Sequence, residues 1–69
     1  MVSMYDVQQV LKRFGTYVYT GNRLGDIDLM EQEINELYQL EFIGLNEYQL
    51  AKLILKKEAR RLQIKKDES

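Results

Sequence analysis

The sequence predicts an all-α protein, a three-helix bundle with short connections. Apolar residues recur at intervals of three and four in three separate segments, which is the spacing of one buried helix face. No proline interrupts these segments, and the four glycines fall mainly between them. A chain of 69 residues has room for one such domain. We expect the bundle to occupy residues 1–64 and residues 65–69 to form a disordered tail.

The first helix is predicted to run from Met4 to Phe14. Ser3 is a favourable N-cap, and Asp6 follows three residues later as in a capping box. Gly15 predicts a left-handed stop at the other end. The predicted buried stripe consists of Met4, Val7, Val10, Leu11 and Phe14.

Residues 15–21 read Gly-Thr-Tyr-Val-Tyr-Thr-Gly and separate the first helix from the second. Aromatic and β-branched residues favour extended backbone, but a lone strand has no partner for its hydrogen bonds. We therefore predict an extended or loosely turned connector, with a continued helical turn as the alternative.

The second helix is predicted to begin at Asn22 or at Gly25–Asp26, because both Asn22 and Asp26 are good caps. It should end between Leu40 and Ile43, with Gly44 as the stop. Asp26, Asp28 and Glu31 are acids near its start, where the helix dipole favours negative charge. The predicted buried stripe is Ile27, Met30, Ile34, Leu37 and Tyr38.

The third helix is predicted to run from Glu47 to Gln63 or Lys65. Asn46 is its expected N-cap, with Leu45 and Leu50 as a hydrophobic staple around it. The predicted buried stripe is Tyr48, Ala51, Leu55, Ala59 and Leu62.

Charge divides the chain into an acidic and a basic part. Residues 24–51 hold seven acids and no base, whereas residues 52–66 hold seven bases and the single acid Glu58. Two interpretations follow: neighbouring helices of opposite charge that pair with each other, or a basic arm for an anionic partner.

The residue inventory argues against an enzyme. Histidine and cysteine are absent, so disulfides, zinc sites of the usual kind and thiol chemistry are excluded. The only serines are Ser3, which is explained as a cap, and Ser69 at the end of the sequence. The acids at 26–31 lack the loop ligands of a calcium site. We expect no catalytic residue, no metal and no cofactor.

Apolar runs are also too short for a membrane span, which needs about 18 consecutive residues. The N-terminus lacks the charged-then-apolar order of a signal peptide. We therefore expect a cytoplasmic protein with no membrane partner.

A stretch without acids combines aromatic and basic residues, as in surfaces that bind single strands. Between residues 12 and 23 the net charge is +3, and Tyr5 extends the same pattern. We predict a surface for single-stranded RNA or DNA, unless the tyrosines cap the core with their hydroxyls in water. The candidate residues are Lys12, Arg13, Tyr17, Tyr19 and Arg23.

The alternative function is a protein–protein adaptor or a homo-oligomer. Several apolar residues of the second and third helices lie off the predicted core stripes and would suit a partner helix or a second copy. These residues are Leu29, Leu40, Leu50 and Ile54.

Three segments, YDVQQ at 5–9, YVYTGNR at 17–23 and DI at 26–27, resemble the YqgQ-like family of small bacterial proteins. The resemblance extends through residues 29–38 and 48–55 and reaches about residue 60. It implies a three-helix bundle in a cytosolic bacterial protein and no particular activity. It adds some weight to single-stranded nucleic-acid binding. Its most specific part, the Tyr-Val-Tyr-Thr-Gly segment, coincides with the aromatic-basic stretch.

Overall fold

The computed structural model describes the backbone of residues 3–67 and the side chains of residues 3–62. It contains three α-helices, α1 (Met4–Arg13), α2 (Arg23–Gln39) and α3 (Leu45–Asp67), and the described residues form no strand. The predicted all-α three-helix bundle is therefore confirmed.

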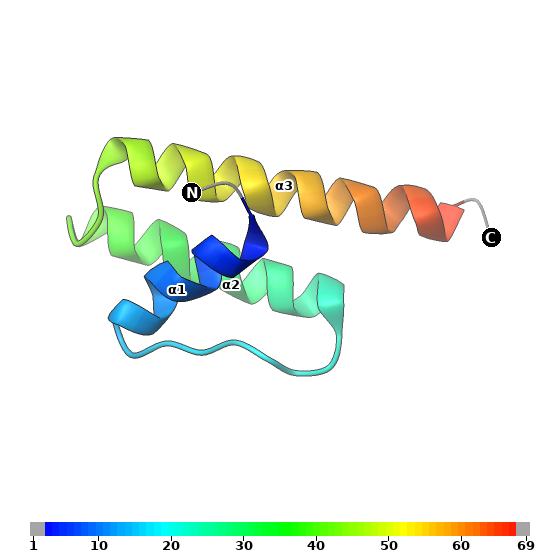
Figure 1. Ribbon diagram of the computed structural model, residues 1–69, viewed down its shortest axis with the longest axis horizontal. Helices are drawn as coiled ribbons and strands as arrows, with labels where there is room; N and C mark the ends of the chain where they lie inside the picture. Colours follow the sequence, from blue (N-terminus) through cyan, green and yellow to red (C-terminus); the bar gives the residue numbers. More distant parts are fainter. Residues whose placement is uncertain (1–2, 68–69) are drawn as a thin grey trace.

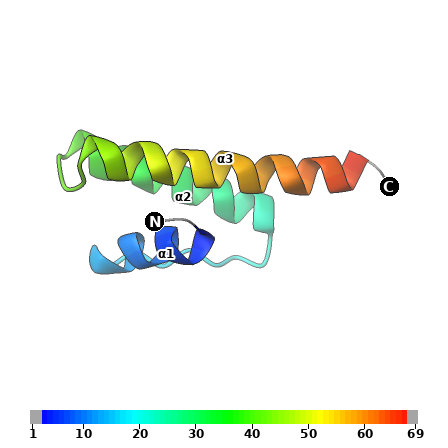
Figure 2. The same cartoon turned by 45° about the horizontal axis from the view of Figure 1, so that its top comes forward.

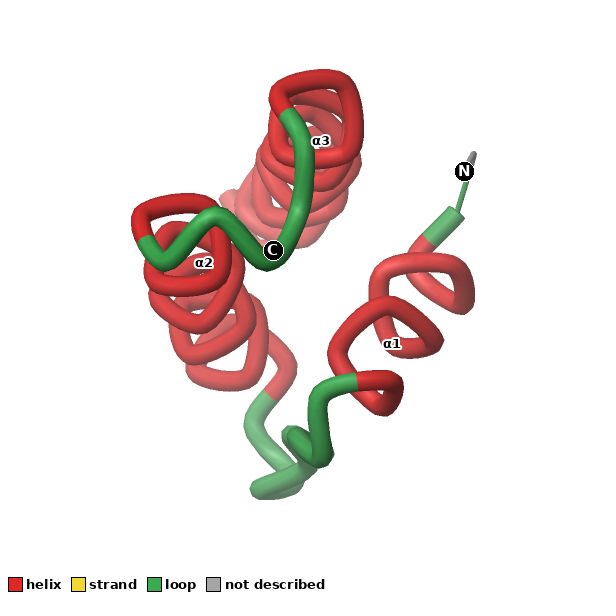
Figure 3. The backbone as a smooth tube through the Cα atoms, turned by 90° about the vertical axis from the view of Figure 1, so that its left-hand side faces the viewer, coloured by secondary structure: helices red, strands yellow, loops and turns green. Residues whose placement is uncertain are grey.

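The two longer helices form an antiparallel pair, and the short α1 lies along one side of it (Figure 1). Viewed from one end, the three helices occupy the corners of a triangle (Figure 3). The segment between α1 and α2 returns beside α1, and the C-terminal part of α3 extends past the start of α2 (Figure 2). Every described helix thus has one face toward the central axis.

The core is built from the predicted stripes. Its largest fully buried side chains are Val7, Leu11, Ile34 and Leu55, which come from all three helices. Phe14 was predicted to belong to the stripe of α1, but 38 % of it is exposed. It caps the helix after Arg13, leaves the helical spacing there, and stacks on the ring of Phe42 with 5.7 Å between ring centroids.

The start of α1 carries the predicted capping box, in which the Asp6 carboxylate accepts a hydrogen bond from the Ser3 backbone N–H at 3.2 Å. Its end is closed by Gly15, which has a φ of +80° as predicted. The Gly15 N–H donates to the Lys12 carbonyl and the Thr16 N–H to the Leu11 carbonyl, each at 3.0 Å. This pair of bonds is a Schellman motif.

The predicted end of α2 is wrong. The helix stops at Gln39, and Glu41, rather than Gly44, takes the left-handed conformation, with a φ of 63°. The Glu41 N–H donates to the Tyr38 carbonyl at 3.0 Å and the Phe42 N–H donates to the Leu37 carbonyl at 2.9 Å. The same Schellman motif therefore closes α2, with a glutamate where glycine is favoured.

The starts of α2 and α3 lie closer to the predicted positions than the end of α2 does. Asn22 caps α2, since its side chain accepts a hydrogen bond from the Gly25 N–H at 3.0 Å. The third helix begins at Leu45, two residues before the predicted Glu47. It continues to Asp67, so residues 65–67 of the predicted tail have helical backbone, and residues 68–69 lie outside the described residues.

Within the described side chains, the acids of α2 do not pair with the bases of α3, and the ion pair between these helices, Arg23 with Glu58, has the opposite polarity. None of the ion pairs among residues 3–62 links an acid of α2 to a base of α3. The contact instead contains stacked Tyr38 and Tyr48 rings 4.1 Å apart, and Asn35 Oδ1 accepts hydrogen bonds from Tyr48 and Lys52. Asp28 and Glu36 of α2 are exposed, as are several bases of α3, namely Lys56, Lys57, Arg60 and Arg61.

Two features are absent from the part of the chain that the structure describes. No helix has the length and apolar character needed to cross a membrane. No group of three or more acidic, histidine or cysteine side chains within that part is arranged to hold a metal ion.

Candidate functional site

The connector between α1 and α2 is extended, as the sequence predicts, and does not continue the helix. Successive side chains of an extended segment point to opposite sides. Val18 points inward and is 8 % exposed, whereas its neighbours Tyr17 and Tyr19 are 66 % and 75 % exposed. Two aromatic rings are therefore presented to solvent from a backbone that the core holds in place.

Side chains replace the missing partner strand. Gln8 of α1 donates from Nε2 to the Val18 carbonyl at 3.3 Å. The Thr20 backbone N–H and hydroxyl both donate to Asp26 Oδ1, at 2.8 and 2.6 Å. Asp26 is buried in the first turns of α2, where the helix dipole favours its negative charge. These bonds fix both halves of the connector.

Helix α1 lies beside the connector (Figure 2). The Lys12 ammonium nitrogen lies 5.7 Å from the centroid of the Tyr17 ring, a cation–π distance. At the other end, Tyr5 and Tyr19 line one groove, and Tyr5 is 69 % exposed. We call this surface the tyrosine face and define it as Tyr5, Gln8, Lys12, Tyr17, Tyr19 and Arg23.

The groove has a volume of about 230 Å³. This is below the range of about 300–1,000 Å³ typical of pockets for drug-sized ligands, so the groove has room for a single ring system. Gln8 Oε1 is buried beside it with no hydrogen-bond partner among the described residues. The groove is lined by Met4, Tyr5, Gln8, Val18, Tyr19, Arg23, Asp26, Ile27, Met30 and Glu58.

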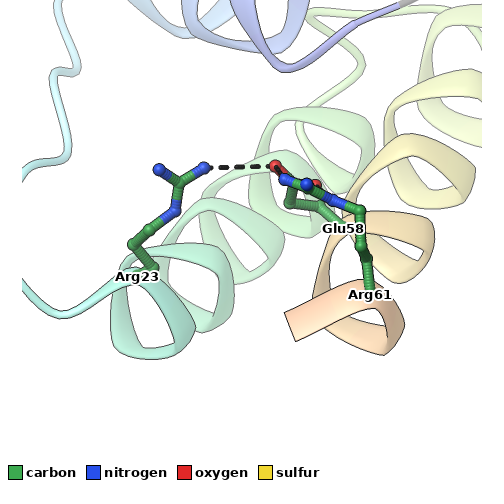
Figure 4. Close-up of polar contacts among 3 residues, drawn as sticks. All are labelled: Arg23, Glu58 and Arg61. Atoms are coloured by element: carbon green, nitrogen blue, oxygen red, sulfur yellow. Dashed lines mark hydrogen bonds and ion pairs between the residues drawn. The ribbon is translucent and has the colours of Figure 1, made fainter. Parts of the chain in front are cut away.

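Two residues of the groove lining, Arg23 and Glu58, form a charged triad with Arg61 (Figure 4). Glu58 of α3 accepts from Arg23 of α2 at 3.2 Å and from Arg61 of α3 at 2.8 Å. The Glu58 side chain is only 14 % exposed, and its hydrogen bond to Arg61 and the positive charges of both arginines lower the pKa of its carboxyl group. Two cations around one anion leave this triad with a net charge of about +1.

Four of the five predicted nucleic-acid residues lie on the tyrosine face, and Arg13 does not. Arg13 forms an ion pair of 2.8 Å with Glu47 of α3. Consecutive helix residues differ by about 100° in direction, so Lys12 meets the connector while Arg13 turns toward α3. Sequence reasoning also missed Gln8, Glu58 and Arg61. The last two approach Arg23 only through packing of α3.

Of the residues predicted for a protein interface, three are exposed and one is half-buried. Leu29, Leu40 and Leu50 are exposed by 42 %, 54 % and 43 %. Ile54 is half-buried and packs against the core, whereas Leu53 is 52 % exposed. A helical turn of 3.6 residues therefore places Leu53, rather than Ile54, on the outer side of α3.

Comparison with known proteins bears on this geometry. The model of the YqgQ-like family matches residues 1–61, which include the whole tyrosine face and the charged triad. The chain belongs to the YqgQ-like family. "Uncharacterized protein YqgQ" of Bacillus subtilis (strain 168) is 43 % identical to it over 58 residues, which cover 84 % of this chain and 82 % of that relative. Family membership confirms the resemblance seen in the sequence.

Proposed function

We propose that this YqgQ-like protein binds single-stranded RNA or DNA, weakly and with little sequence preference, through the tyrosine face. The observation that supports this role best is the exposure of three tyrosine rings, Tyr5, Tyr17 and Tyr19, at one surface. The rings of Tyr17 and Tyr19 do not cap the core, because Val18 fills that place. Stacking of a base on an aromatic ring contributes about 1–3 kcal/mol and accepts any base.

The charges at this surface support modest phosphate binding. Lys12 lies beside Tyr17, and the triad adds about one net positive charge near Tyr19. Two phosphate contacts on a single strand give a slope of about −1.4 in a plot of log affinity against log salt concentration. We expect a slope near that value. We also propose that the protein is cytoplasmic and has no catalytic activity.

Fluorescence anisotropy with short labelled single-stranded oligonucleotides, at several salt concentrations, tests this proposal. The alanine variants of Tyr17 and Tyr19 should each weaken binding by about 5- to 150-fold, which corresponds to one lost stacking contact. Absence of binding by the wild-type protein at low salt contradicts the proposal. So does binding that does not change with salt.

Lys12 and Arg13 provide a matched pair of variants, since both are exposed cations near the end of α1. Lys12→Ala should make the salt slope less steep by about 0.7, because one phosphate contact is removed. Arg13→Ala should leave the slope unchanged, because its guanidinium pairs with Glu47 away from the tyrosine face. Equal effects of the two substitutions would indicate non-specific attraction to the whole protein.

Glu58→Gln provides a test in the opposite direction. Removal of this carboxylate frees Arg23 and Arg61 and raises the local charge by one unit. Oligonucleotide affinity at low salt should increase, and the salt slope should become steeper by about 0.7. Weaker binding by a folded Glu58→Gln protein would show that the triad has another role.

A further inference from the structure

Two helices carry outward rows of side chains with the same spacing and opposite charge. Read backward along α2, the acidic row is Leu40, Glu36, Glu33 and Leu29, with steps of four, three and four residues. Read forward along α3, the basic row is Leu53, Lys57 and Arg60, with steps of four and three, and Ile64 takes the next position in the sequence.

These rows are accessible. Leu29, Leu40 and Leu53 are exposed by 42 %, 54 % and 52 %. Among their charged members, Glu36, Lys57 and Arg60 are exposed and Glu33 is half-buried. None of the four charged side chains forms an ion pair with another of residues 3–62. Both rows therefore offer apolar surface next to uncompensated charge.

The two rows of one molecule cannot meet each other. The basic row lies on the side of α3 opposite the buried Ala51 and Leu55. The acidic row lies on a flank of α2 turned away from Asn35, which contacts α3. Because α2 and α3 already face each other through Tyr38 and Tyr48, the rows point in different directions.

We propose that the acidic row of one copy binds the basic row of a second copy, with the two helices antiparallel. In this register Leu40 lies opposite Leu53, and Leu29 lies opposite position 64. The charged residues between them, Glu36 with Lys57 and Glu33 with Arg60, then fall into opposite pairs. The reason for choosing a second copy is this agreement of spacing, polarity and charge sign along three successive positions.

The contact is head-to-tail, because each copy presents a different row to each of two neighbours. Assembly should therefore continue beyond a dimer as concentration rises, and it should weaken with salt. No member of either row belongs to the tyrosine face, so this inference does not depend on nucleic-acid binding.

Charge exchange between the rows tests the proposal in sedimentation velocity experiments from micromolar to millimolar protein at low salt. The average mass of the wild-type protein should increase with concentration. K57E/R60E makes both rows acidic and E33K/E36K makes both basic. Each double variant alone should therefore associate about tenfold more weakly than wild type. Circular dichroism establishes that each variant is folded.

An equimolar mixture of the two double variants should recover the association, because each acidic row then meets a basic one. The variant with all four substitutions should also recover it. Lys56→Glu, which changes the same charge on a different side of α3, should associate as wild type does. A wild-type protein that remains monomeric at millimolar concentration overturns the proposal. Folded double variants that associate normally, or a mixture that shows no recovery, also overturn it.

Discussion

Replacement of Glu41 by glycine should stabilise the protein. Glu41 ends α2 with a φ of 63°, a left-handed conformation that glycine adopts readily and other residues do not. Gly15 holds the equivalent position after α1, with the same pair of closing hydrogen bonds. The two helix ends therefore compare a glutamate with a glycine in one backbone motif.

The size of the effect follows from two opposing terms. A residue with a Cβ atom loses about 1–2 kcal/mol in the left-handed region, and glycine recovers this cost. Glycine also makes the unfolded chain more flexible, which subtracts about 0.5–1 kcal/mol. The Glu41 side chain is exposed, so its removal costs little. The net stabilisation is about 0.5–1 kcal/mol, or about 2–8 °C in the melting temperature of a domain this small.

Urea and thermal unfolding followed by circular dichroism measure this change. The midpoint for Glu41→Gly should rise while the dependence on urea stays the same. Gly15→Ala is the control, because it makes the reverse change at the equivalent position of α1, and it should lower stability by about 1 kcal/mol. If Gly15→Ala is destabilising but Glu41→Gly leaves the midpoint unchanged or lower, the strain assigned to Glu41 is refuted.

Three further changes should each alter the free energy of unfolding measured in urea. Leu55→Ala removes a fully buried side chain and should cost about 2–5 kcal/mol, with loss of most helical signal if stability is modest. Thr20→Val removes the hydroxyl that donates to buried Asp26 and should cost about 1.5 kcal/mol; no loss would show that the connector is held by other contacts. Because the pKa of Glu58 is lowered in the fold, its stabilising effect is present above an unfolded pKa of about 4.3 and is lost as the pH falls through the folded value. Glu58→Gln should therefore be less stable than wild type at neutral pH, and this difference should shrink in acid; a constant difference would contradict the assignment.

Helix positions were predictable because burial follows local spacing. The stripes of all three helices supply the core, and Ser3, Asn22 and Gly15 act at the helix ends as their residue types predict. The end of α2 was not predictable in this way. There, the hydrogen bonds to the last helical carbonyls and the burial of Ile43 place the left-handed residue at Glu41, despite its side chain.

The candidate site was likewise predictable from the sequence in part only. Its local part, with Tyr17 and Tyr19 outward on an extended connector, follows from alternation along the chain. The difference between Lys12 and Arg13 depends on where α3 lies, which residues 12–23 do not specify. Glu58 reaches Arg23 across 35 positions of sequence, so only the packed structure reveals it.

Nuclear magnetic resonance titration of ¹⁵N-labelled protein with a short single strand at low salt tests the central claim most directly. The proposed function predicts the largest amide shifts at residues 16–20, with further changes at Tyr5, Lys12 and Arg23, and little change along the outer side of α3. Shifts confined to the basic row of α3, or no shifts at millimolar strand, would contradict binding through the tyrosine face.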